Sequence, residues 1–274
     1  MEKIKNALEK AKQQQTGTPA PAKAVVRNQP TKFIEESDDL ESIKYDTSAV
    51  VELDAAYLES KRIVAVNKHD PASWIFDSLR TQVLQKMEEN NWRTLAIVSP
   101  TPESGKTFVA INLAISIAQQ PLKTALLVDF DLRRPRIANY LGLKLNKSIN
   151  ELLAGNAELE EIMVNPGIPR LTILPTKTPT TKTSETLASK NIQRLVTELR
   201  ERYDSRIVIF DLPPILTADD AMVLLPQVDC ALLVVCDGMN TKDELDETMR
   251  LLSKTNIVGV VANKADVEPR AYYY

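Results

Sequence analysis

The sequence is poor in the residues on which several common catalytic and metal sites depend. It has 7 glycines, 1 histidine and 2 cysteines among 274 residues, whereas average usage would give roughly 19 glycines. A single histidine, His69, excludes a multi-histidine metal site and argues against a histidine-centred catalytic triad. Cys230 and Cys236 lie in the apolar run CALLVVC, which predicts buried free thiols of a reducing compartment. With glycine so scarce, any glycine inside a motif carries weight.

The sequence also has no signal-peptide pattern and no long apolar run. Its N-terminus is charged throughout and no apolar h-region follows. The longest apolar stretches are far below the ~20 residues of a membrane helix, so we expect a cytoplasmic protein. Residues 1–30 carry a net charge of +4, residues 31–60 carry −7, and the rest is neutral. A neutral body argues against a nucleic-acid partner.

The sequence divides into an N-terminal extension, residues 1–60, and a folded domain, residues 61–274. Residues 1–15 have apolar side chains at helical spacing. They predict a short helix that either docks on a membrane or a partner, or frays in solvent. Residues 16–30 form a Pro/Ala/Gln linker, and residues 33–59 are acidic with few large apolar side chains. We therefore expect a helix and a flexible acidic linker, with the extension largely disordered.

From about Pro71, apolar runs alternate with helical patterns. An amphipathic helix is expected around residues 74–87. Strands are expected at residues 94–99, 124–130, 171–174, 207–210, 231–236 and 257–262, and helices between them at 107–119, 148–153, 191–203, 219–225 and 243–254. The strands are continuous Val/Ile/Leu runs, typical of strands buried on both faces of a parallel sheet. The alternation predicts a doubly wound α/β domain with a mostly parallel sheet.

The first expected strand runs into a loop that ends as a phosphate-binding loop does, in Gly-Lys-Thr before a helix. Backbone N–H groups of such a loop cradle phosphate oxygens. The lysine would reach the β- and γ-phosphates, and the threonine hydroxyl would bind Mg²⁺. Pro100 stands where the full pattern has a glycine, and Glu103 adds a negative charge. The predicted nucleotide-binding residues here are Glu103, Ser104, Gly105, Lys106, Thr107 and Phe108.

Carboxylates follow two further strands, at the sheet edge on which ligands of such folds bind. Asp129 and Asp131 end the second strand and precede Arg133; Asp211 ends the strand at 207–210. Carboxylates there suit Mg²⁺, and one of the first pair would instead accept a proton from an attacking hydroxyl. Arg133 would stabilise charge on a transferring phosphoryl group. A capped turn with a surface salt bridge is the alternative reading of the first pair.

Two motifs near the C-terminus bear on the base and on the acceptor. Asn263 opens the sequence N-K-x-D, the form in which GTPases read guanine. No D-x-x-G follows Asp211, so we favour ATP over GTP, with Asn263 flanking the base. The chain also carries Tyr272, Tyr273 and Tyr274. Three adjacent phenols on a mobile end suit phosphoryl acceptors, although terminal aromatics also tuck against apolar surfaces.

Together the segments SPTPESGKT, ALLVDFDLRRP, IVIFDLPP and the tyrosine cluster resemble the bacterial P-loop tyrosine kinases (BY-kinases of the CpsD/CapB type). The similarity covers residues 71–274, and it is closest to the cytoplasmic kinases encoded with exopolysaccharide export systems. The septum-site and partition ATPases share the implied P-loop NTPase fold. The partition-ATPase signature lysine would fall at Thr101, so that branch matches less well.

This resemblance implies Mg·ATP-dependent autophosphorylation that controls polysaccharide polymerisation and chain length. It implies a catalytic set of Lys106, Asp129, Asp131 and Arg133, a metal set of Thr107, Asp129 and Asp211, and phosphorylation of Tyr272, Tyr273 and Tyr274. It also implies a membrane partner, a chain-length-determinant protein (polysaccharide co-polymerase), which would recruit the kinase to the inner face of the plasma membrane.

The sequence departs from the family in the helix before the first strand. Family members often carry E-x-x-R-x-x-R there for assembly into rings, whereas this chain has Trp74, Asp77 and Arg80. A homo-oligomer is therefore an open expectation. Two other functions remain as alternatives: a regulatory ATPase or GTPase switch of the partition type, and a nucleotide-binding scaffold without turnover.

Overall fold

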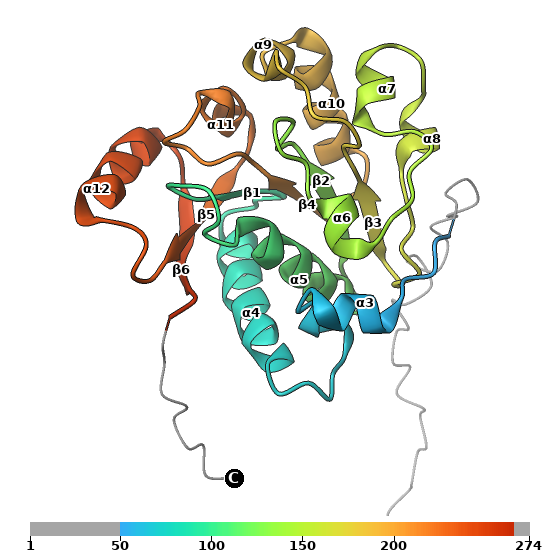
Figure 1. Ribbon diagram of the computed structural model, residues 1–274, viewed down its shortest axis with the longest axis horizontal. Coiled ribbons are helices and arrows are strands. Elements are labelled where there is room, and N and C mark those ends of the chain that lie inside the picture. Colours follow the sequence, from blue (N-terminus) through green and yellow to red (C-terminus); the bar gives the residue numbers. More distant parts are fainter. Residues whose placement is uncertain (1–49, 266–274) are drawn as a thin grey trace, which may run out of the picture. The chain divides into compact units, whose positions relative to one another are not determined.

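A six-stranded sheet forms the centre of the computed structural model, which describes residues 50–265 (Figure 1). The strand order is β3-β2-β4-β1-β5-β6, and every neighbouring pair runs parallel. The strands are β1 (Thr94–Val98), β2 (Thr124–Asp129), β3 (Leu171–Leu174), β4 (Arg206–Asp211), β5 (Cys230–Cys236) and β6 (Ile257–Asn263). The six expected strands are confirmed, and the sheet is wholly rather than mostly parallel.

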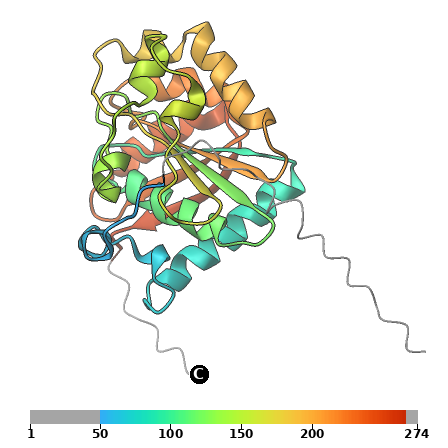
Figure 2. The ribbon, with the colours of Figure 1, turned by 90° about the vertical axis from the view of Figure 1, so that its right-hand side faces the viewer.

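Helices cover both faces of the sheet (Figure 2), which confirms the doubly wound arrangement. Helices α4 and α5 pack on one face, and α10 and α11 on the other. The helices are α3 (Ala55–Ser60), α4 (Ser73–Glu89), α5 (Lys106–Ala118), α6 (Ile137–Leu141), α7 (Ile149–Leu153), α8 (Leu159–Ile162), α9 (Thr183–Leu187), α10 (Lys190–Glu201), α11 (Asp220–Leu224) and α12 (Lys242–Leu251), with 3₁₀ turns η1 (Val64–Val66), η2 (Leu225–Gln227) and η3 (Leu252–Lys254).

Strands β1 to β5 are mostly apolar because both of their faces are buried, whereas the edge strand β6 is only partly buried. In β1, Leu95 and Ile97 point into the core beneath α4 and α5, whereas Ala96 and Val98 point into the core beneath α10. All four side chains are fully buried. This two-sided burial is the physical reason for the continuous apolar runs, since side chains of a strand alternate between its two faces.

The strand register brings carboxylates to one edge of the sheet. Asp129 at the end of β2 lies opposite Asp211 at the end of β4, and Asp211 also pairs with Ile97 of β1. β1 lies between β4 and β5 and leads into the loop before α5. The order of the strands therefore places that loop beside the two acids.

The sequence pattern did not predict several of the short helices. Helices α3, α6, α8 and α9 have four to six residues each, too few for a repeat of 3.6 residues to be recognised. Helix α3 lies in the acidic stretch, where we expected flexibility, and its Leu58 is buried. Part of that stretch is therefore folded, although the expected boundary at residue 60 stays a prediction. The predicted helix in residues 1–15 lies outside the described residues.

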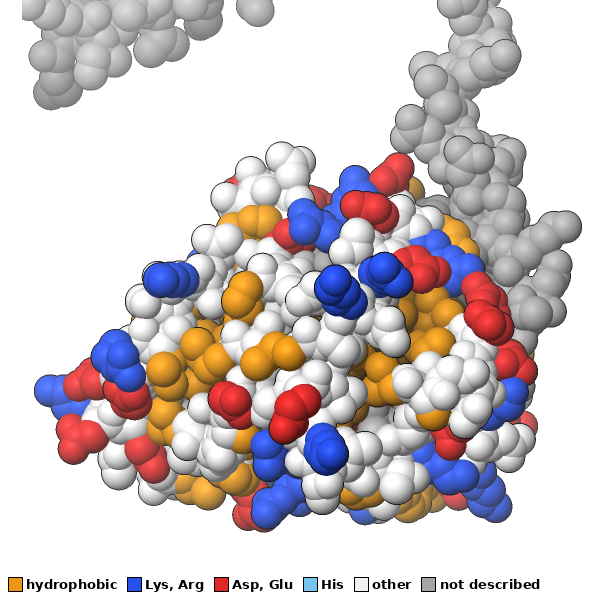
Figure 3. Space-filling view, turned by 90° about the horizontal axis from the view of Figure 1, so that it is seen from above, with side chains coloured by type: hydrophobic (Ala, Val, Ile, Leu, Met, Phe, Trp, Pro, Cys, Tyr) orange, Lys and Arg blue, Asp and Glu red, His pale blue; other side chains and the backbone are white. Residues whose placement is uncertain are grey.

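The cysteines, the helix lengths and the surface charges of the described residues were also subjects of the sequence analysis. Cys230 and Cys236 are buried free thiols, as expected. Burial, assisted by the charge of Asp229, raises the pKa of the Cys230 thiol to about 12, which keeps it unreactive. Among residues 50–265, no helix is both long and apolar enough to span a membrane. Lys/Arg and Asp/Glu side chains are interspersed on the face shown in Figure 3, in line with a neutral body.

A pair of leucine substitutions tests the two-sided core. Leu127 in β2 is fully buried, whereas Leu122 before β2 is 62% exposed. We expect Leu127→Ala to lower the free energy of unfolding by about 2–5 kcal/mol, because it removes buried methyl groups and leaves a cavity. The matched control Leu122→Ala should change it by no more than about 0.5 kcal/mol. Urea denaturation measures both, and equal effects would contradict the fold.

Candidate active site

The loop after β1 delivers Lys106 and Thr107 to the first turn of α5, as predicted. Gly105 caps this helix with a φ of 89°, and Glu103 also has a positive φ, of 64°. A Cβ at Gly105 would lie 2.1 Å from Nδ2 of Asn263. Both the backbone conformation and this close approach therefore require glycine at position 105.

Lys106 and Thr107 meet the carboxylates from the neighbouring strands. Nζ of Lys106 lies 2.9 Å from Oδ2 of Asp131 and 3.3 Å from Oδ1 of Asp211. The Thr107 hydroxyl donates to Oδ2 of Asp211 at 2.6 Å. All four residues are buried. The structure thus brings together groups that the sequence placed on three separate segments.

Asp129 completes the cluster from beneath and is fully buried. Its Oδ2 accepts the backbone N–H groups of Arg136 at 3.1 Å and Ile137 at 3.0 Å, whereas its Oδ1 has no partner. Burial, reinforced by the charge of Asp211, raises the pKa of Asp129 well above its usual value. An acid in this setting takes up a proton more readily than an exposed aspartate does.

The ammonium group stays charged within this cluster. Burial alone lowers the pKa of Lys106, but the charges of Asp211 and Asp131 outweigh it and raise the pKa. Burial also raises the pKa of Asp211, against the opposing effects of Lys106 and Thr107. The buried cation and its carboxylates therefore depend on one another for their charges.

Arg133 lies at the wall of the same cavity but is paired with Asp220 of α11. Its Nε lies 2.5 Å from Oδ2 of Asp220, and its Nη2 lies 3.2 Å from Oδ1. Asp220 is buried and also accepts from the hydroxyls of Thr183 and Ser184. The hydrogen bond that Arg133 donates to Asp220 raises the pKa of Arg133. The predicted role of Arg133 stays a prediction, and it requires exchange of this carboxylate for a phosphate oxygen.

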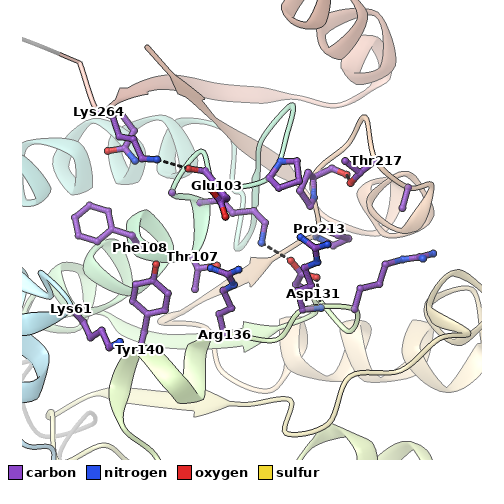
Figure 4. Close-up of a pocket in the computed structure, with 18 of the residues that line it drawn as sticks. Lys61, Glu103, Thr107, Phe108, Asp131, Arg136, Tyr140, Pro213, Thr217 and Lys264 are labelled. Carbon is purple, nitrogen blue, oxygen red and sulfur yellow. Dashed lines mark hydrogen bonds and ion pairs between the residues drawn. The ribbon is translucent and has the colours of Figure 1, made fainter. Parts of the chain in front are cut away.

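These groups open into a cavity of about 610 Å³ (Figure 4), which is within the range of small-molecule sites. Its lining carries seven cationic side chains and two acidic ones. Phe108 lies at the wall and packs edge-on against Phe76 with ring centres 5.6 Å apart. The cationic residues are Lys61, Arg62, Lys106, Arg133, Arg134, Arg136 and Lys264. Such a lining suits a polyanion with several negative oxygens.

Four of these cations were not predicted. Arg134 and Arg136 directly follow the Asp-x-Asp-x-Arg segment, so that segment was the signal that could have indicated them. Lys61 and Arg62 lie about forty residues before the loop in sequence, and no motif marks them. They reach the cavity because α3 packs beside α6.

Asn263 and Lys264 hold the loop itself. Nδ2 of Asn263 donates to the backbone oxygen of Ser104 at 2.8 Å, and Nζ of Lys264 donates to that of Glu103 at 2.8 Å. Ser104 in turn donates through its hydroxyl to the backbone oxygen of Thr101 at 2.9 Å. The N-K-x-D segment therefore supports the loop from β6. Its expected contact with the base stays a prediction.

The predicted acceptors Tyr272, Tyr273 and Tyr274 lie outside the described residues. The last described residue is Ala265, and the preceding Lys264 lines the cavity. The chain thus leaves β6 at the rim of the cavity.

In helix α4, Arg80 is the residue of the E-x-x-R-x-x-R pattern that this chain retains. Nη1 of Arg80 lies 2.8 Å from Oδ1 of Asp77 and 3.2 Å from the backbone oxygen of Ser116. Asp77 also pairs with Lys68 at 2.8 Å. Trp74 is 53% exposed. The surviving arginine therefore ties α4 to α5 within the chain.

Comparison with known proteins identifies relatives of the whole domain. A family model described as "AAA domain" matches residues 93–238. The tyrosine-protein kinase Etk of Escherichia coli (strain K12) is 34% identical over 199 residues, which are 72% of this chain and 27% of Etk. The tyrosine-protein kinase YwqD of Bacillus subtilis (strain 168) is 28% identical over 200 residues, 72% of this chain and 83% of YwqD.

Comparison with solved structures also identifies proteins with a similar fold. The kinase domain of the E. coli tyrosine kinase Etk superposes with a TM-score of 0.68 at 29% identity, covering 86% of this chain and 97% of that domain. The septum-site protein MinD of Pyrococcus horikoshii, complexed with Mg-ADP, has a TM-score of 0.54 at 23% identity, covering 65% and 74%. This second likeness shows the expected P-loop NTPase fold. The chain spans only about 27–28% of the length of several of its relatives.

The burial of Asp129 makes a pH-dependent prediction. A carboxyl whose pKa is raised on folding costs stability as the pH rises from its unfolded pKa, near 3.9, through its folded pKa. Asp129→Asn removes the buried charge, so we expect its melting temperature to exceed that of the wild type, by a margin that grows above about pH 4. Thermal melts across pH measure this. The control Asp204→Asn, at a side chain that is 92% exposed, should show no such growth, and a margin that shrinks with pH would refute the assignment.

Two glycines with similar backbones test the packing of Asn263 on the loop. Gly105 and Gly155 have φ of 89° and 72°, but nothing lies within 4 Å of a Cβ at Gly155. Both alanine substitutions strain the backbone, and only Gly105→Ala adds a clash. We expect it to cost about 1–3 kcal/mol more unfolding free energy in urea denaturation, and Asn263→Ala in the same chain to recover part of that difference. Equal costs for the two glycines would refute the contact.

Proposed function

We propose that this chain, which belongs to the family described as "AAA domain", is an ATP-dependent protein-tyrosine kinase that phosphorylates its own tyrosines. Its similarity to the tyrosine-protein kinases Etk and YwqD supports this proposal. One observation carries this proposal. Lys106 and Thr107, at the N-terminus of α5, meet Asp129, Asp131 and Asp211 at one edge of the sheet. Phosphoryl transfer requires positioning and charge neutralisation rather than covalent chemistry, and these residues provide both.

The cavity supports binding of the triphosphate of ATP. Backbone N–H groups at the start of α5 and the loop N–H groups would hold phosphate oxygens. The ammonium group of Lys106 would leave the carboxylates of Asp131 and Asp211 and bind those phosphate oxygens, which are also anionic. Asn263 and Phe108 lie at the side of the cavity toward β6 and α4, where the base would sit.

Thr107, Asp129 and Asp211 fit Mg²⁺ by their chemistry. The three offer a hydroxyl and two carboxylates, and Oδ1 of Asp129 is buried without a hydrogen-bond partner. Among residues 50–265, no group of three or more His, Cys, Asp or Glu side chains is placed to hold a metal. Mg²⁺ commonly takes only one or two carboxylates together with substrate phosphates, and Asp129 and Asp211 would be those two carboxylates. When bound, the ion supplies positive charge to the phosphates.

The acceptor step needs a proton acceptor and a compensating cation. The phenol oxygen of tyrosine bonds to the γ-phosphorus while the bond from that phosphorus to the β–γ bridging oxygen breaks, which releases ADP. Asp131, which lines the cavity, would take the phenol proton, while Asp129 would remain a ligand of the metal. Once Arg133 has left Asp220, its guanidinium would lie against the equatorial oxygens of the phosphoryl group that is transferred.

We extend the proposal to the cellular setting that the resemblance implies. The kinase would act in the cytoplasm on exopolysaccharide or capsule polymerisation and export. A chain-length-determinant membrane protein (polysaccharide co-polymerase) would recruit it to the inner face of the plasma membrane and activate it. A homo-oligomer would present the tyrosines of one copy to the cavity of another.

Phosphopeptide mass spectrometry tests the activity. A digest at lysines releases residues 265–274, with all three C-terminal tyrosines, as one peptide. With Mg·ATP, we expect phosphotyrosine in this peptide from the wild type and at least ~100-fold less from Lys106→Met, because the cation that neutralises the phosphates is gone. Lys190→Met, at an exposed lysine of α10, is the matched control and should label normally. ATP hydrolysis without phosphotyrosine would favour a regulatory NTPase instead.

A further inference from the structure

A second cavity, of about 510 Å³, adjoins the first on the side of α3 and α6. The two share Lys61, Arg62, Arg136 and Tyr140 in their linings. In Figure 4, Lys61 and Tyr140 lie together on one side of the site, and Arg136 lies between Tyr140 and Asp131. We call this second cavity the basic groove. No acidic residue lines it.

The cations of the basic groove have no anion within the described part of the chain. Lys61, Arg62 and Arg136 form no ion pair among residues 50–265; Lys61 only lies over the ring of Tyr57, 5.2 Å from its centre. Arg133, a few residues from Arg136, is in contrast fully paired with Asp220. Three neighbouring positive charges without a counter-charge repel one another, and an anionic ligand would relieve that repulsion.

The backbone conformation of Arg62 also supports an anionic ligand at the basic groove. Arg62 follows α3 with a φ of 58°, and its N–H donates to the backbone oxygen of Glu59 at 2.9 Å. Glycine is the usual residue where a helix ends in this left-handed conformation. An arginine there accepts backbone strain, and such strain gathers at functional sites.

The phosphates of a nucleotide are not the ligand that the basic groove best fits. They belong at the N-terminus of α5, and no residue of the loop 100–107 lines the groove. A protein acceptor must reach the γ-phosphate from outside the loop. The groove shares cations with the first cavity but none of the loop residues, so it would hold the acidic flank of an acceptor tyrosine beside the phosphates.

The chain itself carries an acidic segment with a tyrosine. Residues 35–46 contain six Asp/Glu, one Lys and Tyr45. The C-terminal residues 265–274 have only two acids and one arginine. The acidic segment is also joined to the groove along the chain, because α3 ends at Ser60 and Lys61 and Arg62 follow directly.

We propose that the basic groove docks the acidic segment, residues 35–46 of this chain, and that Tyr45 is a further autophosphorylation site. This rests on the proposed kinase function. The phenol oxygen of Tyr45 takes the γ-phosphoryl group of ATP, ADP leaves, and the phenol proton passes to a carboxylate of the site. The acids before Tyr45 pair with Arg62, Arg136 and Lys61.

Full-length protein with Mg·ATP tests the proposal in the same digest that reports the C-terminal tyrosines. The peptide of residues 45–61 contains Tyr45 and Tyr57, which fragment ions distinguish. We expect phosphate on Tyr45 and none on Tyr57, whose hydroxyl donates to the backbone oxygen of Asn139 at 2.8 Å. In Arg62→Glu/Arg136→Glu, the ratio of Tyr45 labelling to C-terminal labelling should fall about tenfold or more, because like charges then face each other.

Two further variants separate docking from a general loss of activity. The variant Glu35→Gln/Glu36→Gln/Asp38→Asn/Asp39→Asn removes four of the six acids of the acidic segment and should lower the same ratio. Arg194→Glu, at an exposed arginine of α10, should leave it unchanged. C-terminal labelling with no phosphate on Tyr45, or an unchanged ratio in the groove variant, would overturn the inference and leave the kinase function standing. No phosphotyrosine at all would overturn both.

Discussion

The buried ion cluster of Lys106 with Asp131 and Asp211 is the interaction on which the site depends. A buried ammonium group is tolerated only when anions surround it, and buried carboxylates only when a cation or hydrogen bonds accompany them. Here the strand order brings both to one edge, with Nζ of Lys106 2.9 Å and 3.3 Å from its two partners. Asp129 adds a third carboxylate without adding a cation, which is why its pKa rises. The cluster is therefore short of positive charge.

The sequence revealed the sheet because the physics of the sheet is local to each strand. Burial on both faces makes most positions of a central strand apolar, so the apolar runs could be recognised one by one, and Asp129 and Asp211 marked two strand ends. Their meeting could be anticipated, since parallel strands end at one edge. Lys61 and Arg62 could not be found this way. They reach the cavity through the packing of α3 beside α6, a contact between segments about eighty residues apart that no local pattern encodes.

Residue types alone did not indicate which partners hold the side chains of the site. An arginine after two aspartates suggested a free cation for the transferred phosphoryl group, yet Arg133 is held in two hydrogen bonds by Asp220, which Thr183 and Ser184 orient. The N-K-x-D segment suggested contact with a base, yet Asn263 and Lys264 hold two carbonyls of the loop. Both arrangements depend on which partner lies nearest in space. They join the cavity to α9 and α11 on one side and to β6 on the other.

Charge is distributed unevenly over the chain, although the net charge of the whole sequence is only −3. The acidic residues 31–60 and the basic cavity lining have opposite signs, while the face shown in Figure 3 mixes both. Exposed charges on a mixed surface are screened within about 8–10 Å at physiological ionic strength, so distant attraction contributes little. Selectivity for an anionic ligand must then arise inside the cavity, where Lys61, Arg62 and Arg136 form no ion pair within the described part of the chain. A short basic cavity in a neutral body therefore discriminates by contact, not by long-range steering.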